Sequence, residues 1–383
     1  MPIYKSPAKK ETVADKLKGV KLPKQRMGPL WAGPCGEGPQ GGVTQSMLSR
    51  YLVCKERFRI MTIEGLKPAE KFNPPIDFGN MWHAAEEDHA AGRSGLDGGK
   101  LDACVAAYRK KFPLDQEAIL HWYSVTAELF PVYAFHWEQH PDVKDRMPLL
   151  QEQSFDVPYR LPSGRTVRLR GKWDSVDQVG QGKIAGVWLQ ENKTKSSINR
   201  TKIERQLRMD LQTMIYLIAL GEFSGAGGKL GIPGTTGEPI KGVRYNVIRR
   251  SAHKTTDSML KKLNEDRADG RINEWFSRWS VEVSAKDVEI FKQTVLDPEL
   301  ENLCDDYEWW LYCKVANSDE RRNVYDFALR EKEFDHRLRH ARRPFGLYDV
   351  LAEGGATDLD EHLASGSTAG LRVVDDLFPE ISQ

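Results

Sequence analysis

The stretch GKWDSVDQVGQGKIAGVWLQENKTK, residues 171–195, decides the fold and the chemistry predicted for this chain. Its first half continues the alternating residues TVRLR (166–170) and has the pattern of a β-strand. After a turn that contains glycine, an apolar run leads into Glu191 and predicts a second strand. We therefore expect Asp174 and Glu191 to lie near each other on paired strands.

The order Glu191-Asn192-Lys193 on the second strand suits a metal site. Residues two apart on a strand point to the same face, so Glu191 and Lys193 project together, while Asn192 turns away and leaves its main-chain carbonyl free. Two carboxylates and a carbonyl oxygen form a hard-oxygen site for Mg²⁺ or Mn²⁺. The alternative is that Asp174 caps a turn and that Glu191 and Lys193 are a solvated pair at the end of a strand.

Such a site predicts phosphodiester cleavage. A cation held by Asp174 and Glu191 lowers the pKa of a bound water and neutralises charge that builds on the phosphate. Lys193 would orient that water, assist its deprotonation or offset charge in the transition state.

A helical pattern follows over residues 199–223, NRTKIERQLRMDLQTMIYLIALGEF. Gln212 and Tyr216 are four residues apart on it, so an amide and a phenol lie on one stripe and can reach a phosphate, a base edge or a metal-bound water together. The alternative is a buried tyrosine beside a glutamine at the boundary of the core. The apolar face of this helix is formed by Leu207, Leu211, Met214, Ile215 and Ile218.

The ordered set D-x16-E-x-K followed by Q-x3-Y resembles the RecB-like branch of the PD-(D/E)XK nuclease superfamily, which includes CRISPR-associated and phage exonucleases. Two upstream stretches are similar to its N-terminal motifs: TQSMLSRYLVCKERFRI (44–60) and FGNMWHAAEED (78–88). The resemblance covers roughly residues 44–250, and Trp173 stands where the superfamily name has proline.

The resemblance implies an α/β fold: a restriction-endonuclease-like core with a mixed central sheet flanked by helices, and helical N- and C-terminal additions. The expected strands lie near 149–159, 166–179, 184–193 and 242–250, with the helix before the last of them. Further helical patterns lie around 44–65, 79–92, 115–139 and 301–316 and from about Thr256. In the helix at 301–316, we expect Tyr307, Trp310 and Tyr312 to pack in the core rather than to stack on bases.

The resemblance also implies the site residues. Those with a catalytic role would be Asp174, Glu191, Lys193, Gln212 and Tyr216. The ligands of Mg²⁺ or Mn²⁺ would be His83, Asp174, Glu191 and Asn192. The candidate DNA contacts are Lys195, Arg205, Arg208, Arg339 and Arg342.

The cysteines do not match the iron-sulfur members of this branch, which need one cysteine upstream of the core and three closely spaced ones after it. No C-x2-C occurs here, and only two cysteines lie downstream of the core. We therefore expect no cluster, and we interpret Cys54 as a small buried hydrophobic residue. The five cysteines are Cys35, Cys54, Cys104, Cys304 and Cys313.

Length and composition bound the organisation of the chain. It has 383 residues and a net charge of +1, and it contains no run of the roughly 18 to 20 apolar residues that a membrane span requires. Because residues 1–25 lack an apolar centre, we expect no secretory signal. Unpatterned cysteines fit a reducing compartment, so we expect a cytoplasmic protein, in the host cytoplasm if it is phage-encoded. We divide the chain into a basic, Gly/Pro-rich tail (1–43), a nuclease core (44–300) and a helical, basic extension with an acidic tail (301–383).

Charge is uneven along the chain. The basic first segment can hold phosphates without reading sequence, or it is a solubilising leader. The cluster Arg330–Arg343 either contacts the DNA backbone or forms a solvated helix face. The acidic C-terminal tail, which carries Asp358 and Asp375, either docks a protein partner or packs on its own domain.

We interpret the chain as a Mg²⁺- or Mn²⁺-dependent DNA nuclease, an exonuclease of phage or mobile-element DNA replication, recombination or repair. One alternative is a catalytically silent DNA-binding subunit of the same fold. Another is a structure-specific or sequence-specific endonuclease. The intact acidic pair and lysine argue against a silent protein, because carboxylates without a cation repel phosphate.

Overall fold

A computed structural model describes most of the chain, and its contacts divide the chain into two compact units. The larger unit contains residues 43–45 and 70–300, and the smaller unit combines segments of 1–42, 46–69 and 301–382. The division of the sequence at 43/44 and 300/301 stays a prediction. The described residues are 29–63, 65–68, 72–90, 92, 98–140, 146–180, 185–207, 209–225, 240–251, 253, 255–315, 371–374, 376–379 and 381.

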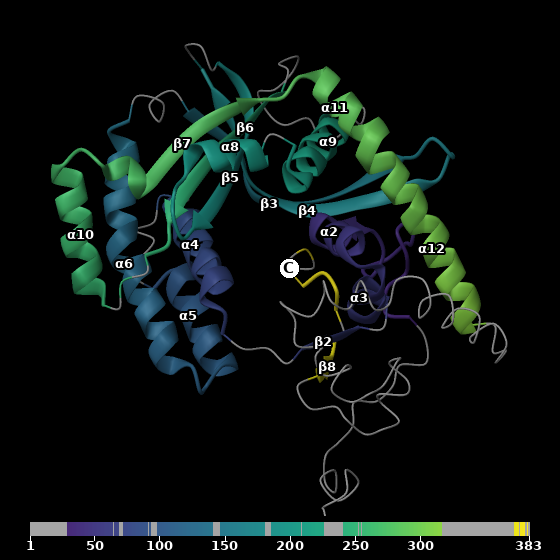
Figure 1. The fold of residues 1–383 in the computed structure, drawn as a ribbon, viewed down its shortest axis with the longest axis horizontal. Helices are drawn as coiled ribbons and strands as arrows, with labels where there is room; N and C mark the ends of the chain where they lie inside the picture. The colour runs from purple at the N-terminus through teal and green to yellow at the C-terminus, as the bar shows by residue number, and fades with distance from the viewer. Residues whose placement is uncertain are drawn as a thin grey trace, which may run out of the picture. The chain divides into compact units, whose positions relative to one another are not determined.

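The larger unit is built on a mixed sheet of six strands (Figure 1). The strand order is β1-β4-β5-β6-β7, and β3 pairs with β4. The β1–β4 and β5–β6 pairs are parallel and the others are antiparallel. The mixed sheet confirms the predicted fold class. The strands are β1 (Val43–Thr44), β3 (Arg146–Arg160), β4 (Thr166–Val179), β5 (Gly186–Lys195), β6 (Ile240–Arg249) and β7 (Phe276–Glu282).

Strands β4 and β5 separate partway along their length. They pair from Val179 opposite Gly186 to Ser175 opposite Gln190, and the register ends there. Beyond that point β5 continues alongside β6, while β4 continues alongside β3 and meets β1. The next residues on the diverging strands are Asp174 and Glu191, so both carboxylates stand where the sheet opens.

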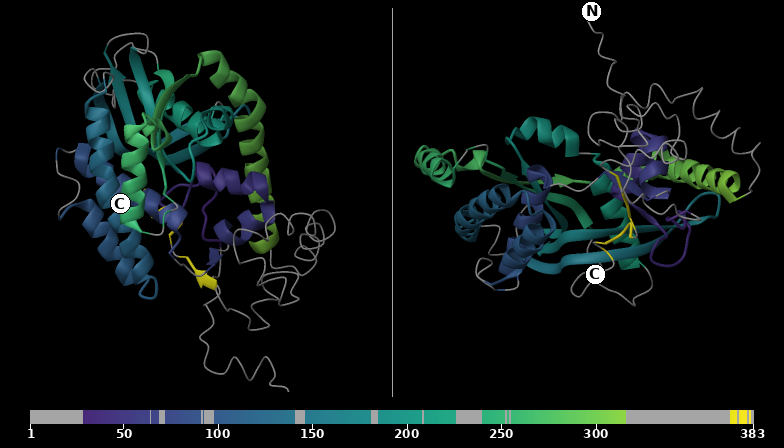
Figure 2. Two further views of the ribbon diagram at one scale, coloured as in Figure 1. Left: turned by 60° about the vertical axis from the view of Figure 1, so that its left-hand side comes forward. Right: turned by 90° about the horizontal axis from the view of Figure 1, so that it is seen from below.

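Helices cover both faces of this sheet. Consecutive residues of β6 show the two sides: the Tyr245 hydroxyl lies 2.6 Å from that of Thr213 on α9, whereas Asn246 donates to Glu86 on α4. Helices α4, α5, α6 and α10 group together on the Glu86 side and share one core (Figure 1, Figure 2). Helices α9 and α11 lie on the Thr213 side. The bounds are α4 (Pro74–Ala90), α5 (Lys100–Lys111), α6 (Gln116–Glu138), α8 (Arg200–Leu207), α9 (Leu211–Gly225), α10 (Thr256–Ala268), η2 (Ile272–Glu274), α11 (Ala285–Phe291) and η3 (Lys292–Leu296).

The helix predicted over 199–223 is two helices, α8 and α9. Asp210 begins the second one, because its Oδ2 atom accepts a hydrogen bond from the backbone N–H of Thr213 at 3.1 Å. The single periodic pattern was therefore wrong at this point, although Met214, Ile215 and Ile218 are buried as expected. Helix α5 was not predicted.

The smaller unit is held by aromatic side chains. Trp31 packs edge-on against Phe58 and Tyr307, and Trp310 stacks on Phe58. Trp310 is 4% exposed, which confirms the predicted core packing for this residue. Cys54 is buried as expected. The elements are α2 (Gln45–Val53), α3 (Lys55–Phe58), the π-helical η1 (Arg59–Ile63), most of α12 (Asp297–Val315), and β2 (Leu66–Pro68) paired with β8 (Leu371–Val373).

Within the described ranges, no helix is long and apolar enough to cross a bilayer. Residues 1–28, the basic cluster Arg330–Arg343 and most of the acidic C-terminal tail lie outside the described residues. The roles proposed for them in binding phosphate or a protein partner stay predictions.

Candidate active site

The site begins with Asp174 on β4 and the backbone of β5. Asp174 Oδ2 accepts a hydrogen bond of 2.8 Å from the backbone N–H of Asn192. This bond joins the two strands just beyond the last residues of their ladder. The Asp174 side chain is 14% exposed and that of Glu191 is 3% exposed, so both carboxylates are largely removed from water.

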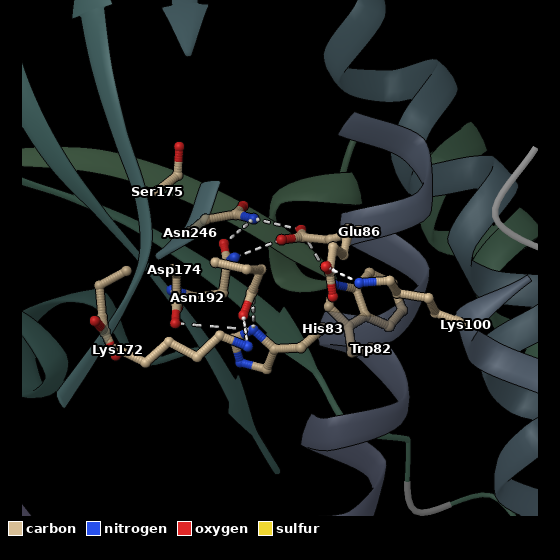
Figure 3. A network of polar contacts seen from close by, with 12 residues as sticks. Trp82, His83, Glu86, Lys100, Lys172, Asp174, Ser175, Asn192 and Asn246 are labelled. Atoms are coloured by element: carbon tan, nitrogen blue, oxygen red, sulfur yellow. Dashed lines mark hydrogen bonds and ion pairs between the residues drawn. The ribbon is translucent and has the colours of Figure 1, made fainter. Parts of the chain in front are cut away.

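Side chains from three elements, α4, β3 and β4, converge at this point of the sheet. His83 points from α4 toward Asp174 (Figure 3), and its Nδ1 atom lies 3.9 Å from Asp174 Oδ1 and 3.4 Å from Glu152 Oε1. The candidate ligand atoms of His83, Glu152 and Asp174 all lie within 4.8 Å of one another. Nitrogen and carboxylate oxygen at this spacing can share one divalent cation.

Glu152 is a site residue that the sequence analysis missed. It lies on β3 between Gln151, which pairs with Ser175, and Gln153, which pairs with Trp173, and so it stands opposite Asp174. Its Oε2 atom is 2.7 Å from Lys172 Nζ. No motif marks a lone glutamate in an alternating strand, and only its register with β4 reveals it.

Glu191, Lys193 and Gln212 form a closed triangle of hydrogen bonds. Lys193 Nζ donates to Glu191 Oε1 at 2.6 Å and to Gln212 Oε1 at 2.7 Å, and Gln212 Nε2 donates to Glu191 Oε1 at 2.9 Å. The predicted pairing of Glu191 with Lys193 on one side of β5 is therefore confirmed. Gln212 holds the lysine and the carboxylate together from α9.

Tyr216 lies one turn after Gln212 on α9. Its ring packs edge-on against Phe155, and its backbone carbonyl accepts a hydrogen bond from Trp173 Nε1. Burial, with the charges of Glu191 and Asp174, raises the pKa of its phenol. The hydroxyl is therefore a stable proton donor at the edge of the site.

Asn192 turns away from the acidic cluster, as predicted, and joins a buried network around Glu86 (Figure 3). Glu86 accepts hydrogen bonds from the side-chain amide of Asn192, from the Tyr133 hydroxyl, and from Trp82 Nε1 and Asn246 Nδ2 at 3.3 Å each. Since Glu86 lies three residues after His83 on α4, this network fixes the helix that presents His83 to β4.

Burial and neighbouring charges shift the pKa values of the site residues. Burial, followed by the repulsion of Glu191, raises the pKa of Asp174 to about 7. Burial alone would lower the pKa of His83, but the carboxylates of Asp174 and Glu152 outweigh it and raise that pKa to about 10. Lys193 behaves in the same way, because burial lowers its pKa and contact with Glu191 raises it.

The residues fit a divalent cation. Oε2 of Glu191 and Oε1 of Glu152 are buried, and neither accepts a well-formed hydrogen bond from the described residues. Buried carboxylate oxygens require a partner, and a divalent cation can be bound both by them and by the nearby histidine nitrogen. His83, Asp174 and Glu191 would hold it.

The predicted DNA contacts are mostly outside the described part of the chain. Lys195 ends β5 two residues after Lys193, and burial and the charge of Lys193 lower its pKa. Arg205 lies in α8 with its side chain undescribed, and Arg208, Arg339 and Arg342 are not described. Their contacts with DNA stay predictions.

Comparison with known proteins agrees with this geometry. A family model described as "PD-(D/E)XK nuclease superfamily" matches residues 43–343. Among curated proteins, none matches the chain.

Proposed function

Because the chain belongs to the PD-(D/E)XK nuclease superfamily, we propose that it is a RecB-like nuclease that cleaves DNA with Mg²⁺ or Mn²⁺. Membership implies a metal-dependent nuclease. The observation that carries the proposal is the opening between β4 and β5, where Asp174 and Glu191 follow the last paired residues and Lys193 contacts Glu191.

Each residue has a distinct role in this proposal. A divalent cation bound at this site would supply Lewis acidity, lowering the pKa of a water and neutralising phosphate charge. Asp174, Glu191 and His83 would hold it, together with the main-chain carbonyl of Asn192. Lys193 orients the nucleophile and offsets charge on the phosphate.

Gln212 and Tyr216 support this machinery from α9. Gln212 fixes the position of the Lys193 ammonium through its 2.7 Å hydrogen bond. Tyr216 offers a protonated phenol beside the same carboxylates. A fixed lysine costs less reorganisation during the reaction than a mobile one.

We further propose an exonuclease of phage or mobile-element DNA replication, recombination or repair, on the ordered similarity of residues 44–250 to the RecB-like branch. The rival from another class is a catalytically silent DNA-binding subunit. The buried oxygens of Glu152 and Glu191 that accept no hydrogen bond from the described residues argue against it, because without a cation such carboxylates repel the phosphate that a DNA-binding subunit must bind. An endonuclease that reads structure or sequence is the third candidate.

The test is incubation of the purified protein with end-labelled linear DNA and with covalently closed circular DNA, in Mg²⁺, Mn²⁺ or EDTA. An exonuclease degrades only the linear DNA, and EDTA stops it. Cleavage of the circle identifies an endonuclease. DNA binding without cleavage in either metal supports the silent subunit.

A further inference from the structure

We propose that Glu152 is a ligand of the catalytic cation, so that α4, β3 and β4 each supply one side chain to it. The inference rests on the proposed function, because it assigns a residue to the same site. Three observations carry it: the burial of Glu152, its backbone conformation and its convergence with two other candidate ligands.

The first observation is a buried oxygen. The Glu152 side chain is 8% exposed, and one of its oxygens, Oε2, is paired with Lys172 Nζ at 2.7 Å. The other, Oε1, is buried without a well-formed hydrogen bond from the described residues, although His83 Nδ1 lies 3.4 Å away. The ion pair with Lys172 therefore accounts for Oε2, and Oε1 is left facing His83.

The second observation is the backbone of Glu152. Its φ of 47° is the single positive value among the described non-glycine residues. Left-handed conformations are unfavourable for a residue with a Cβ, and they persist where their surroundings impose them, often at functional sites. Here Gln151 and Gln153 stay paired with β4 on either side, so the unusual conformation is confined to the residue opposite Asp174.

The third observation is convergence. Glu152 Oε1 and Asp174 Oδ1 both approach His83 Nδ1, and the three candidate ligand atoms fit within 4.8 Å. A purely structural ion pair between Glu152 and Lys172 needs neither the histidine nor Asp174. One divalent cation bound between them would contact all three side chains, including the buried Oε1 atom of Glu152.

The test is Mn²⁺ binding to the full chain without DNA, with free Mn²⁺ counted by its electron paramagnetic resonance signal. Glu152→Gln and Glu152→Asp should each weaken binding by about tenfold or more. Glu152→Asp is the decisive variant, since it keeps the charge and shortens the reach. Asp156→Asn is the matched control: it removes a carboxylate from the same strand, one paired with Arg168 and Arg170, and should leave affinity unchanged.

Variants made in the His83→Ala protein distinguish a metal ligand from a residue that only positions His83. In the His83→Ala protein, Glu152→Gln should weaken Mn²⁺ binding further if Glu152 contacts the ion. Glu152→Gly is a further variant that should keep the fold, because glycine adopts the left-handed backbone conformation readily. It should lose Mn²⁺ affinity to the same extent as Glu152→Gln.

The inference is wrong if Glu152→Asp binds Mn²⁺ with wild-type affinity. It is also wrong if Glu152→Gln causes no further loss of Mn²⁺ affinity in the His83→Ala protein. Asp174→Asn should lose Mn²⁺ binding in either case. If Asp174→Asn binds Mn²⁺ like the wild type, the proposed active site itself is wrong, and the two failures are thereby distinguished.

Discussion

Lys193 contacts both a carboxylate and an amide of the site, and its ammonium is positioned without a direct bond to Asp174 among the contacts described. We expect Lys193→Ala to lower single-turnover cleavage by about 10²- to 10³-fold, because the lost ammonium stabilises charge on the phosphate. Mn²⁺ binding and DNA affinity should persist. Lys193→Arg should rescue poorly, since a planar guanidinium cannot occupy the same point.

Two results would contradict this role. Loss of DNA affinity in parallel with cleavage would move Lys193 to substrate binding. Full cleavage by both the alanine and the arginine variant would show that the Lys193 ammonium has no role in the chemical step. Metal and DNA binding measured on the same preparations distinguish these cases.

At the level of single residues, the sequence indicated which side chains on β5 and α9 would lie together. Glu191, Lys193 and Gln212 have a spacing that indicates their contacts directly. Glu152 could not be found in this way, because the β3–β4 register shifts between Pro148 and Leu150 and such an irregularity leaves no pattern in a single sequence. The positive φ of Glu152 cannot be predicted from the sequence either.

At the scale of elements, Glu86 ties α4 to α6, β5 and β6. Glu86→Ala leaves several buried donors without an acceptor, so we expect a loss of about 3 kcal/mol in the free energy of unfolding, with slower cleavage because His83 and Asn192 lose their support. Glu86→Gln keeps one carbonyl acceptor and should cost less. Urea unfolding measures both.

The neighbouring Glu87 provides the matched control. It pairs with Lys100 near the surface, and Glu87→Ala should change the free energy of unfolding by less than about 0.5 kcal/mol. Equal effects of the two alanine substitutions would show that the Glu86 network does not hold α4 in place.

Asp266 connects α10 to the turn η2 and gives a pH-dependent test. Its side chain is 1% exposed and accepts hydrogen bonds from Lys262 Nζ at 2.9 Å and Trp275 Nε1 at 3.0 Å. These bonds, and the charge of Arg271, lower the pKa of the carboxyl. Its stabilisation is therefore present above the unfolded pKa of about 3.9 and is lost as the pH falls through the folded pKa.

Asp266→Asn should accordingly lower the urea midpoint at pH 7, and the difference from the wild type should shrink below about pH 3.9. A difference that stays constant across this range would show that the ionised carboxylate is not what stabilises the contact. Thermal unfolding over the same pH range is an independent check.

Helices and strands were predicted from the spacing of apolar residues, and the predictions failed where that spacing does not reveal a boundary. Strands β4 and β5 and helix α6 lie close to their predicted ranges, since each has a clear apolar pattern. The break between α8 and α9 depends on one capping side chain, Asp210, inside a pattern that continues through it. Local capping overrode the longer repeat.

At the scale of the whole molecule, the cysteines bear on the class of nuclease. Cys35 and Cys304 lie close together, with their Sγ atoms 3.8 Å apart. We expect no visible absorption from an iron-sulfur cluster, and we expect the double change of Cys304 and Cys313 to serine to leave cleavage nearly unchanged. Iron analysis that finds about four irons per chain would contradict this.

The family and the mixed sheet could be predicted from the sequence, because the order of the motifs along the chain can be recognised without the structure. The two compact units were not, because segments far apart in the sequence, 46–69 and 301–382, cluster together. Contacts of that range depend on tertiary packing, which local patterns do not encode.

The central claim is that Asp174 and Glu191 form a metal-dependent nuclease centre. Its most direct test is single-turnover cleavage of end-labelled linear DNA by the wild type, Asp174→Ala and Glu191→Ala in Mg²⁺ and in Mn²⁺, with urea unfolding to verify each fold. We expect the wild type to cleave and both folded variants to be inactive, because each loses a cation ligand that no neighbour replaces. Near wild-type cleavage by both variants would contradict the claim.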